Sequence, residues 1–134
     1  MKELIDFLKT NPVGCLATVK GDRPNARPFQ FMMEDGGKLY FCTSNKKEVY
    51  RELEANPNAC FSGVAADTTY VRIWGKAEFV KDAAVKEKVI DSSDLVKSIY
   101  KSASNPDFEV FYFGNGSAFL GDLKGGPPKE YTFR

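Results

Sequence analysis

Alternation of apolar and polar residues dominates the chain and predicts a mainly β fold. Short segments rich in β-branched and aromatic side chains recur, and clusters of Gly, Pro, Asn and Asp separate them. We expect six or seven antiparallel strands, over residues 14–19, 26–32, 38–43, 59–64, 69–80, 108–123 and 130–133. Because so many strands with few helices leave sheet edges exposed, we expect the sheet to close into a small split β-barrel.

Helical spacing of apolar residues interrupts this pattern in only a few places. It predicts a first helix over residues 2–10, which Pro12 ends. A further helical region runs from 82 to 101 and is broken near 91–94, where short polar side chains suit a new N-cap. No repeat or composition change divides the chain, so we expect residues 1–134 to form one domain.

Two adjacent lysines stand at the expected start of another helix. The apolar run before them predicts a strand, and a helix is expected over 46–55 with Ser44 or Asn45 as its N-cap. The first turn of a helix carries the positive end of the macrodipole, so Lys46 and Lys47 are unfavourable there unless an anion is bound. Together with the neighbouring hydroxyls, this corner is typical of a phosphate site, although there is no glycine-rich loop. Lysines that simply point into water are the alternative.

Composition and charge limit the class of protein. The chain has 19 Lys and Arg against 18 Asp and Glu, a net charge of +1, so no overall basic field favours nucleic acid as a partner. No apolar stretch reaches the length of a membrane span, and the amino terminus mixes both charges. We therefore expect a cytoplasmic protein.

Cysteine and histidine usage points away from metal chemistry and from side-chain catalysis. Cys15, Cys42 and Cys60 are widely spaced among apolar or small residues, which is neither a zinc pattern nor a disulfide framework. The chain contains no histidine, the usual general base. We assign no catalytic residue, and we expect the chemistry to belong to a cofactor.

Several short motifs, in order and at characteristic spacing, resemble the FMN-binding split-barrel superfamily, which includes the pyridoxamine 5′-phosphate oxidases. They are Ala17-Thr18-Val19, Gly21-Asp22-Arg23-Pro24, Arg27-Pro28-Phe29, Leu39-Tyr40-Phe41-Cys42-Thr43, Lys46-Lys47, Asn56-Pro57 and Tyr70-Val71-Arg72-Ile73-Trp74-Gly75. Within the superfamily the chain most resembles small bacterial members related to the nitroimidazole-resistance proteins. The resemblance covers nearly the whole chain.

The resemblance implies a homodimer with two FMN molecules at its interface. By the family pattern the phosphate would be held by Thr43, Ser44, Lys46 and Lys47. The aromatic residues Tyr70, Trp74, Phe111 and Tyr112 offer material for the self-complementary interface of such a dimer.

The resemblance also places the flavin ring. The strand that carries Arg27, Pro28, Phe29 and Gln30 corresponds to the one along the ring, with Arg27 near the phosphate or the pyrimidine edge and the backbone of Phe29 and Gln30 near the polar edge. Tyr70 falls where the oxidases often have a flavin-side glutamine. Trp74 is a further candidate contact, with a place in the core or the interface as the alternative.

Departures from the oxidase pattern narrow the function. Pyridoxamine oxidases complete their site with a carboxy-terminal tryptophan and basic residues that include a histidine. This chain ends with residues 128–134, which contain no tryptophan, and it has no histidine at all. We therefore expect a small flavin-dependent oxidoreductase that passes electrons from a reduced donor to a quinone or nitroaromatic acceptor. A flavin-binding module without turnover, which acts as a carrier, store or redox sensor, is the alternative. Deazaflavin in the same groove is another, and haem is the least favoured because no histidine is available as a ligand.

Overall fold

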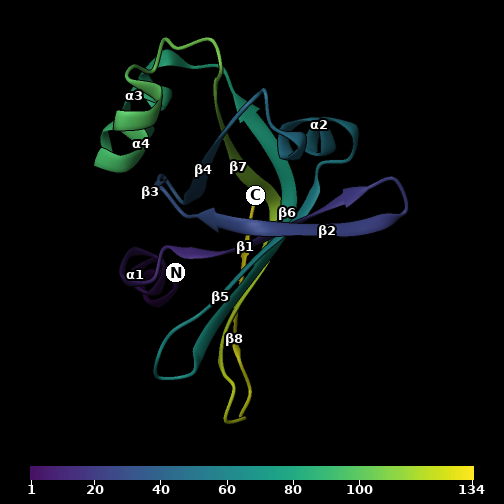
Figure 1. The fold of residues 1–134 in the computed structure, drawn as a ribbon. Helices are drawn as coiled ribbons and strands as arrows, with labels where there is room; N and C mark the ends of the chain where they lie inside the picture. Colours follow the sequence, from purple (N-terminus) through teal and green to yellow (C-terminus); the bar gives the residue numbers. More distant parts are fainter.

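Eight antiparallel strands and four helices make up the fold in the computed structural model, which describes residues 1–134 (Figure 1). The strands are β1 (Val13–Lys20), β2 (Arg23–Gln30), β3 (Met33–Asp35), β4 (Lys38–Ser44), β5 (Asn58–Val64), β6 (Thr69–Val80), β7 (Phe108–Asp122) and β8 (Lys129–Phe133). The helices are α1 (Lys2–Thr10), α2 (Glu48–Ala55), α3 (Ala83–Asp91) and α4 (Asp94–Tyr100). None of the four is long and apolar enough to cross a membrane.

The strands form one sheet, in the order β2-β1-β5-β6-β7-β4-β3, and β8 pairs with β7. This confirms the mainly β class and the split-barrel fold, because the end strands β2 and β3 do not pair and the sheet stays open between them. The seven expected strands are present, and β3 is an eighth that the pattern did not predict. It has three residues and returns into β4 through Gly36 and Gly37, both at positive φ, so it is too short to show an alternation of its own.

Phenylalanine side chains from β4, β5 and β7 fill the centre of the barrel. Phe41 stacks on Phe111 with ring centroids 5.6 Å apart and meets Phe61 and Phe113 at 5.1 and 5.3 Å. Phe111 has no exposed surface, so its expected place in a dimer interface is wrong: it faces the core on the alternation of β7.

Helices α3 and α4 cover a second, smaller core over β4 and β7. Val89 and Ile90 of α3 and Val96 and Tyr100 of α4 are buried there against Phe108. The predicted break is confirmed, because α3 ends at Asp91 and the Ser93 hydroxyl caps α4 by accepting from the Val96 amide at 3.3 Å. In Figure 1 this helix pair and α2 lie on opposite sides of β4.

The start of α2 differs from the prediction. Its N-cap is Lys47, with no side-chain cap, and the acidic Glu48 opens its first turn. Ser44 still belongs to β4, paired with β7, and its hydroxyl accepts from the Lys46 amide at 3.1 Å. The Asn45 side chain donates to Glu109 at 2.9 Å. Strand pairing through Ser44 delays the helix, so neither predicted residue caps it and both lysines precede the first turn.

Candidate functional site

A cavity of about 290 Å³ lies between β2, the end of β4 and α4. Five residues predicted to bind a cofactor line it: Pro28, Phe29, Gln30, Thr43 and Lys47. The strand β2 provides the first three of them, and the corner from β4 to α2 provides the other two. The fold therefore brings the predicted phosphate corner and the predicted ring strand to one site. Along the chain, β3 and most of β4 separate them.

Thr43 has an unusual side chain for a buried position. Only 2% of the residue is exposed, and its hydroxyl has no hydrogen-bond partner in the chain. A buried polar group without a partner costs about 1–3 kcal/mol. Thr43 lines the cavity, and a ligand acceptor that reaches its covered hydroxyl would remove that cost.

Lys46 and Lys47 provide positive charge at the same corner. Both are exposed, and neither forms an ion pair with a carboxylate of the chain. Lys47 lines the cavity, while Lys46 and Ser44 flank it without lining it. Amide groups at an uncapped helix start, an ammonium group and a free hydroxyl together form a chemically suitable site for a phosphate dianion.

A carboxylate also lies near this corner. Glu109, the register partner of Thr43 on β7, is 6% exposed and has one oxygen without a hydrogen bond. The ammonium group of Lys81 lies 3.7 Å from that oxygen, and the Asn45 amide donates to the other at 2.9 Å. Lys81 and Asn45 thus partly compensate the negative charge of Glu109.

The rest of the cavity is apolar. Val96 and Tyr100 of α4 are nearly buried at its base, and Val13, Leu95 and Ile99 are each at least 60% exposed at its rim. Sequence analysis missed all of these α4 residues. The signal that would have indicated them is an excess of apolar positions, since 95, 96, 99 and 100 are more than one buried face of a short helix requires.

Two ionisable groups of the lining are held in their neutral forms. Burial raises the pKa of the Cys42 thiol to about 12, against a small opposing effect of the Lys47 charge. Burial likewise raises the pKa of Tyr100 to about 12. Neither group is a proton donor or acceptor suited to neutral pH.

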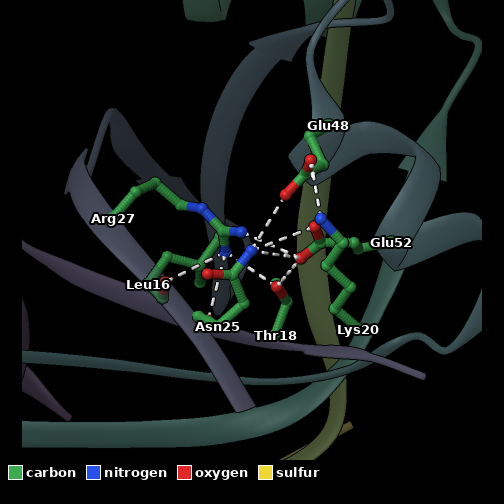
Figure 2. A network of polar contacts seen from close by, with 7 residues as sticks. All are labelled: Leu16, Thr18, Lys20, Asn25, Arg27, Glu48 and Glu52. Carbon is green, nitrogen blue, oxygen red and sulfur yellow. Dashed lines mark hydrogen bonds and ion pairs between the residues drawn. The ribbon is translucent and has the colours of Figure 1, made fainter. Parts of the chain in front are cut away.

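Arg27 lies outside the cavity, although the next residue lines it. Its guanidinium donates to the Glu52 carboxylate at 2.9 Å and to the Thr18 hydroxyl at 2.7 Å (Figure 2). A third contact reaches the Leu16 carbonyl at 3.2 Å. The expected contact of Arg27 with a phosphate or a ring would require it to leave these partners.

Tyr70 and Trp74 lie on β6, away from this cavity. Trp74 is 39% exposed on the outer face of the sheet, where it packs on Phe119 with ring centroids 5.2 Å apart, and Arg72 lies over it. It borders a separate hollow of about 390 Å³. Tyr70 lies on the same outer face. Its ring packs directly on Gly121, so closely that a Cβ atom at that position would lie 2.8 Å from the ring. Within one chain, these two residues and the cavity do not form one site.

Comparison with known proteins identifies the family. The pyridoxamine 5′-phosphate oxidase family model matches residues 1–114. General stress protein 26 of Bacillus subtilis (strain 168) is 32% identical over 95 residues, which are 68% of this chain and 67% of that protein. A crystal structure of a NimC/NimA family protein from Clostridium acetobutylicum is 30% identical and covers 99% of this chain and 92% of that one, with a TM-score of 0.90. The chain therefore belongs to the pyridoxamine 5′-phosphate oxidase family.

More distant solved structures share the fold but carry different descriptions. One, from Nostoc punctiforme, is described as a pyridoxamine 5′-phosphate oxidase-related, FMN binding protein; it is 16% identical over 99% of this chain and 96% of its own, with a TM-score of 0.66. Another is a heme binding protein from Mycobacterium smegmatis, 22% identical over 94% of this chain and 55% of its own, with a TM-score of 0.73. At these identities the likeness is one of fold alone.

Proposed function

We propose that the protein binds FMN in the cavity between β2, β4 and α4, with the phosphate at the Thr43–Lys47 corner. The observation that carries this proposal is the buried Thr43 hydroxyl without a partner, beside the unpaired Lys47 at the uncapped start of α2. Family membership and the description of the Nostoc relative support it.

At the phosphate end, the chain contributes hydrogen-bond donors and charge. The Thr43 hydroxyl donates to a phosphate oxygen, and Lys47 donates from the cavity wall. Lys46 and Ser44 hold the outer side of the corner, where the Ser44 hydroxyl still has a proton to donate after accepting from the Lys46 amide. Hydrogen bonds to an ionised phosphate are the stronger kind.

At the ring end, β2 offers an unpaired strand edge. Its residues pair with β1 on one side only. Backbone groups alternate in direction along an antiparallel strand and the Phe31 amide donates to Pro12, so Phe29 faces β1, while the outward amide and carbonyl of Gln30 are free of any strand partner. These groups suit the polar edge of an isoalloxazine ring. The apolar residues of α4 suit its flat surface.

We assign the protein as a small flavin-dependent oxidoreductase that passes electrons from a reduced donor to a small quinone or nitroaromatic acceptor. FMN supplies the hydride and single-electron chemistry of such a reaction. The chain binds and orients the ring, and the apolar lining excludes water from it.

The site is complete, on this proposal, only in a homodimer. The cavity is at the small end for a ligand site, and its rim residues Val13, Leu95 and Ile99 are exposed apolar side chains. Tyr70 and Trp74 lie on another face of the same chain, so their predicted flavin contacts would have to come from a second copy. Trp and Arg side chains, as at Trp74 and Arg72, are also enriched in protein interfaces.

A flavin-binding module without turnover is the second candidate. It is favoured by the cavity lining, in which Cys42 and Tyr100 both have a pKa of about 12 and so offer no group that exchanges protons at neutral pH. Such a protein would store, carry or sense flavin.

The first experiment is the absorption spectrum of the purified protein, with identification of the ligand that it releases. Stoichiometric FMN is the expected result. A colourless protein that also fails to take up added FMN contradicts the proposal. Bound haem or deazaflavin would replace FMN as the assigned cofactor. Anaerobic mixing of the loaded protein with NADH or NADPH then separates the two candidates, since rapid bleaching with turnover on an added quinone favours the enzyme.

The dimer has its own test. Analytical ultracentrifugation and flavin fluorescence on the same dilution series should show FMN release and dimer dissociation together, because linkage makes the coupling reciprocal. A monomer that holds FMN with undiminished affinity would contradict the shared site.

A further inference from the structure

A buried polar network joins α2 to the hairpin of β1 and β2 (Figure 2). At its centre, one carboxylate oxygen of Glu52 accepts from the Thr18 hydroxyl at 2.5 Å and from the Arg27 guanidinium at 2.9 Å. The other oxygen accepts from the Asn25 side chain at 3.1 Å. The Thr18 hydroxyl itself accepts from Arg27 at 2.7 Å, so both of its hydrogen-bonding roles are used.

The central members of this network are shielded from water. Glu52 is 6% exposed and Thr18 is 3% exposed, and the Arg27 side chain is 21% exposed. Burial by itself would raise the pKa of Glu52, but the hydrogen bonds, led by that of Thr18, hold it at about 2. The carboxylate is therefore ionised at any pH at which the protein would work.

A buried ion pair of this kind adds little net stability, because removing two charges from water costs about as much as their attraction returns. The network does, however, connect specific elements of the fold. The network has α2 on one side and β1 and β2 on the other, and it includes the second α2 carboxylate, Glu48, which accepts from Asn25 at 3.0 Å and from Lys20 at 3.0 Å.

The two ends of the network border the two halves of the cavity. Arg27 immediately precedes Pro28, the first of the three β2 residues that line the cavity. Glu52 follows Lys47, the cavity-lining N-cap, by little more than one helical turn on the same short helix. The pair thus connects the helix that begins at the phosphate corner to the strand that carries the Pro28–Gln30 segment.

We propose that Glu52 and Arg27 are positioning residues for the cofactor site: they hold the start of α2 at a fixed distance from the Pro28–Gln30 segment, and they touch no part of the ligand. This inference rests on the proposed function for its ligand. It assigns to Arg27 a different role from the direct contact with phosphate or ring that the family resemblance implies.

The test compares two ligands that differ only in the phosphate group. Glu52→Gln keeps the size of the side chain but removes the charge that holds Arg27. We expect FMN affinity to fall at least 10-fold and riboflavin affinity to change less than about 2-fold, since only FMN spans both halves of the site. Glu54→Gln is the matched control, because it removes the same charge from the same helix at an exposed position outside the network. It should leave both affinities within about 2-fold of the wild-type protein.

A second variant distinguishes positioning from direct contact. Arg27→Lys keeps the positive charge but cannot bridge Glu52 and Thr18 as a planar fork does. We expect its loss of FMN affinity to match that of Glu52→Gln, and the double variant to lose no more than either single variant. A loss in Arg27→Lys that adds fully to the loss in Glu52→Gln would place Arg27 on the ligand and overturn the proposal.

A readout without flavin separates this inference from the proposed function. Cys42 lies in the cavity wall, and Cys60 lies on a strand outside the network. Labelling of the ligand-free protein with a small maleimide, followed by peptide mass spectrometry, should show Cys42 reacting several-fold faster in Glu52→Gln while Cys60 keeps its rate. Equal acceleration of both thiols, with parallel losses of FMN and riboflavin affinity, would mean general destabilisation and overturn the positioning role. Failure of the wild-type protein to bind FMN would refute the proposed function and leave this labelling test standing.

Discussion

Two polar regions flank α2, and they differ in how completely their hydrogen bonds are satisfied. In the network below the helix, the carboxylate of Glu52 and the hydroxyl of Thr18 both have partners within the chain. At the corner before the helix, the buried Thr43 hydroxyl has no partner, and the exposed Lys47 ammonium forms no ion pair within the chain. Fully bonded buried groups fix the local geometry, whereas an unbonded one beside a cavity leaves a place for a ligand atom or an ordered water. Arg27, for which the family resemblance implies a ligand contact, belongs to the bonded region, where it donates to Glu52 and Thr18.

The largest effect on stability should come from removing one partner of the buried Arg27–Glu52 pair. Arg27→Met leaves Glu52 buried with its charge uncompensated, so the free energy of unfolding should fall by about 3–5 kcal/mol. The double variant Arg27→Met with Glu52→Leu removes both charges and should recover most of that loss. Urea unfolding followed by circular dichroism measures both. A fall below about 1 kcal/mol in the single variant would show that the pair is not effectively buried.

The pH dependence of stability tests the same region. The folded pKa of Glu52, about 2, is depressed below its ordinary value of 4.5, so its contribution is fully present above pH 4.5 and is lost as the pH falls toward 2. The shift corresponds to roughly 3 kcal/mol at most. Unfolding free energies measured from pH 6 to pH 2 should decline across this window, and Glu52→Gln should flatten the curve. An unchanged slope in that variant would assign the acid sensitivity to other carboxylates.

Substitutions of the two lysines at the phosphate corner should change ligand affinity and leave the stability of the fold unchanged. Lys46→Ala with Lys47→Ala removes charge-assisted donors, so FMN affinity should fall by roughly 1.5–3 kcal/mol. Riboflavin lacks the phosphate and should bind as before, and the urea midpoint should stay the same because both lysines are exposed. Isothermal titration with each ligand measures the difference. Equal weakening of both ligands would mean that the lysines act through folding, and no change in either would leave them as solvated side chains.

The smallest and sharpest effect concerns Thr43. Thr43→Val replaces an unpartnered buried hydroxyl with a methyl group of similar shape, so the ligand-free protein should become more stable by about 1 kcal/mol. FMN affinity should fall by about 1 kcal/mol at the same time. Thr18→Val is the comparison, because that hydroxyl is fully bonded and its loss should only destabilise. A loss of stability in Thr43→Val would indicate that its hydroxyl has a partner after all, such as ordered water.

The sequence by itself determined the features that depend on near neighbours. Alternation identified seven of the eight strands, helical spacing identified α1, and the short polar residues before Asp94 identified the break between α3 and α4. The lysine pair pointed to the corner where the cavity lies. Each of these signals is local, because periodicity and capping act within a few residues.

Only the tertiary structure decided what depends on distant partners. Pairing with β7 extends β4 through Ser44 and so moves the start of α2 past both predicted caps. Arg27 and Glu52 are 25 residues apart, and nothing in the sequence near either one indicates the other. The same applies to Trp74, which the alternation of β6 places on the outer face, away from the cavity. Which groups a side chain meets across the sheet is set by strand order and register, and a single sequence carries no direct record of either.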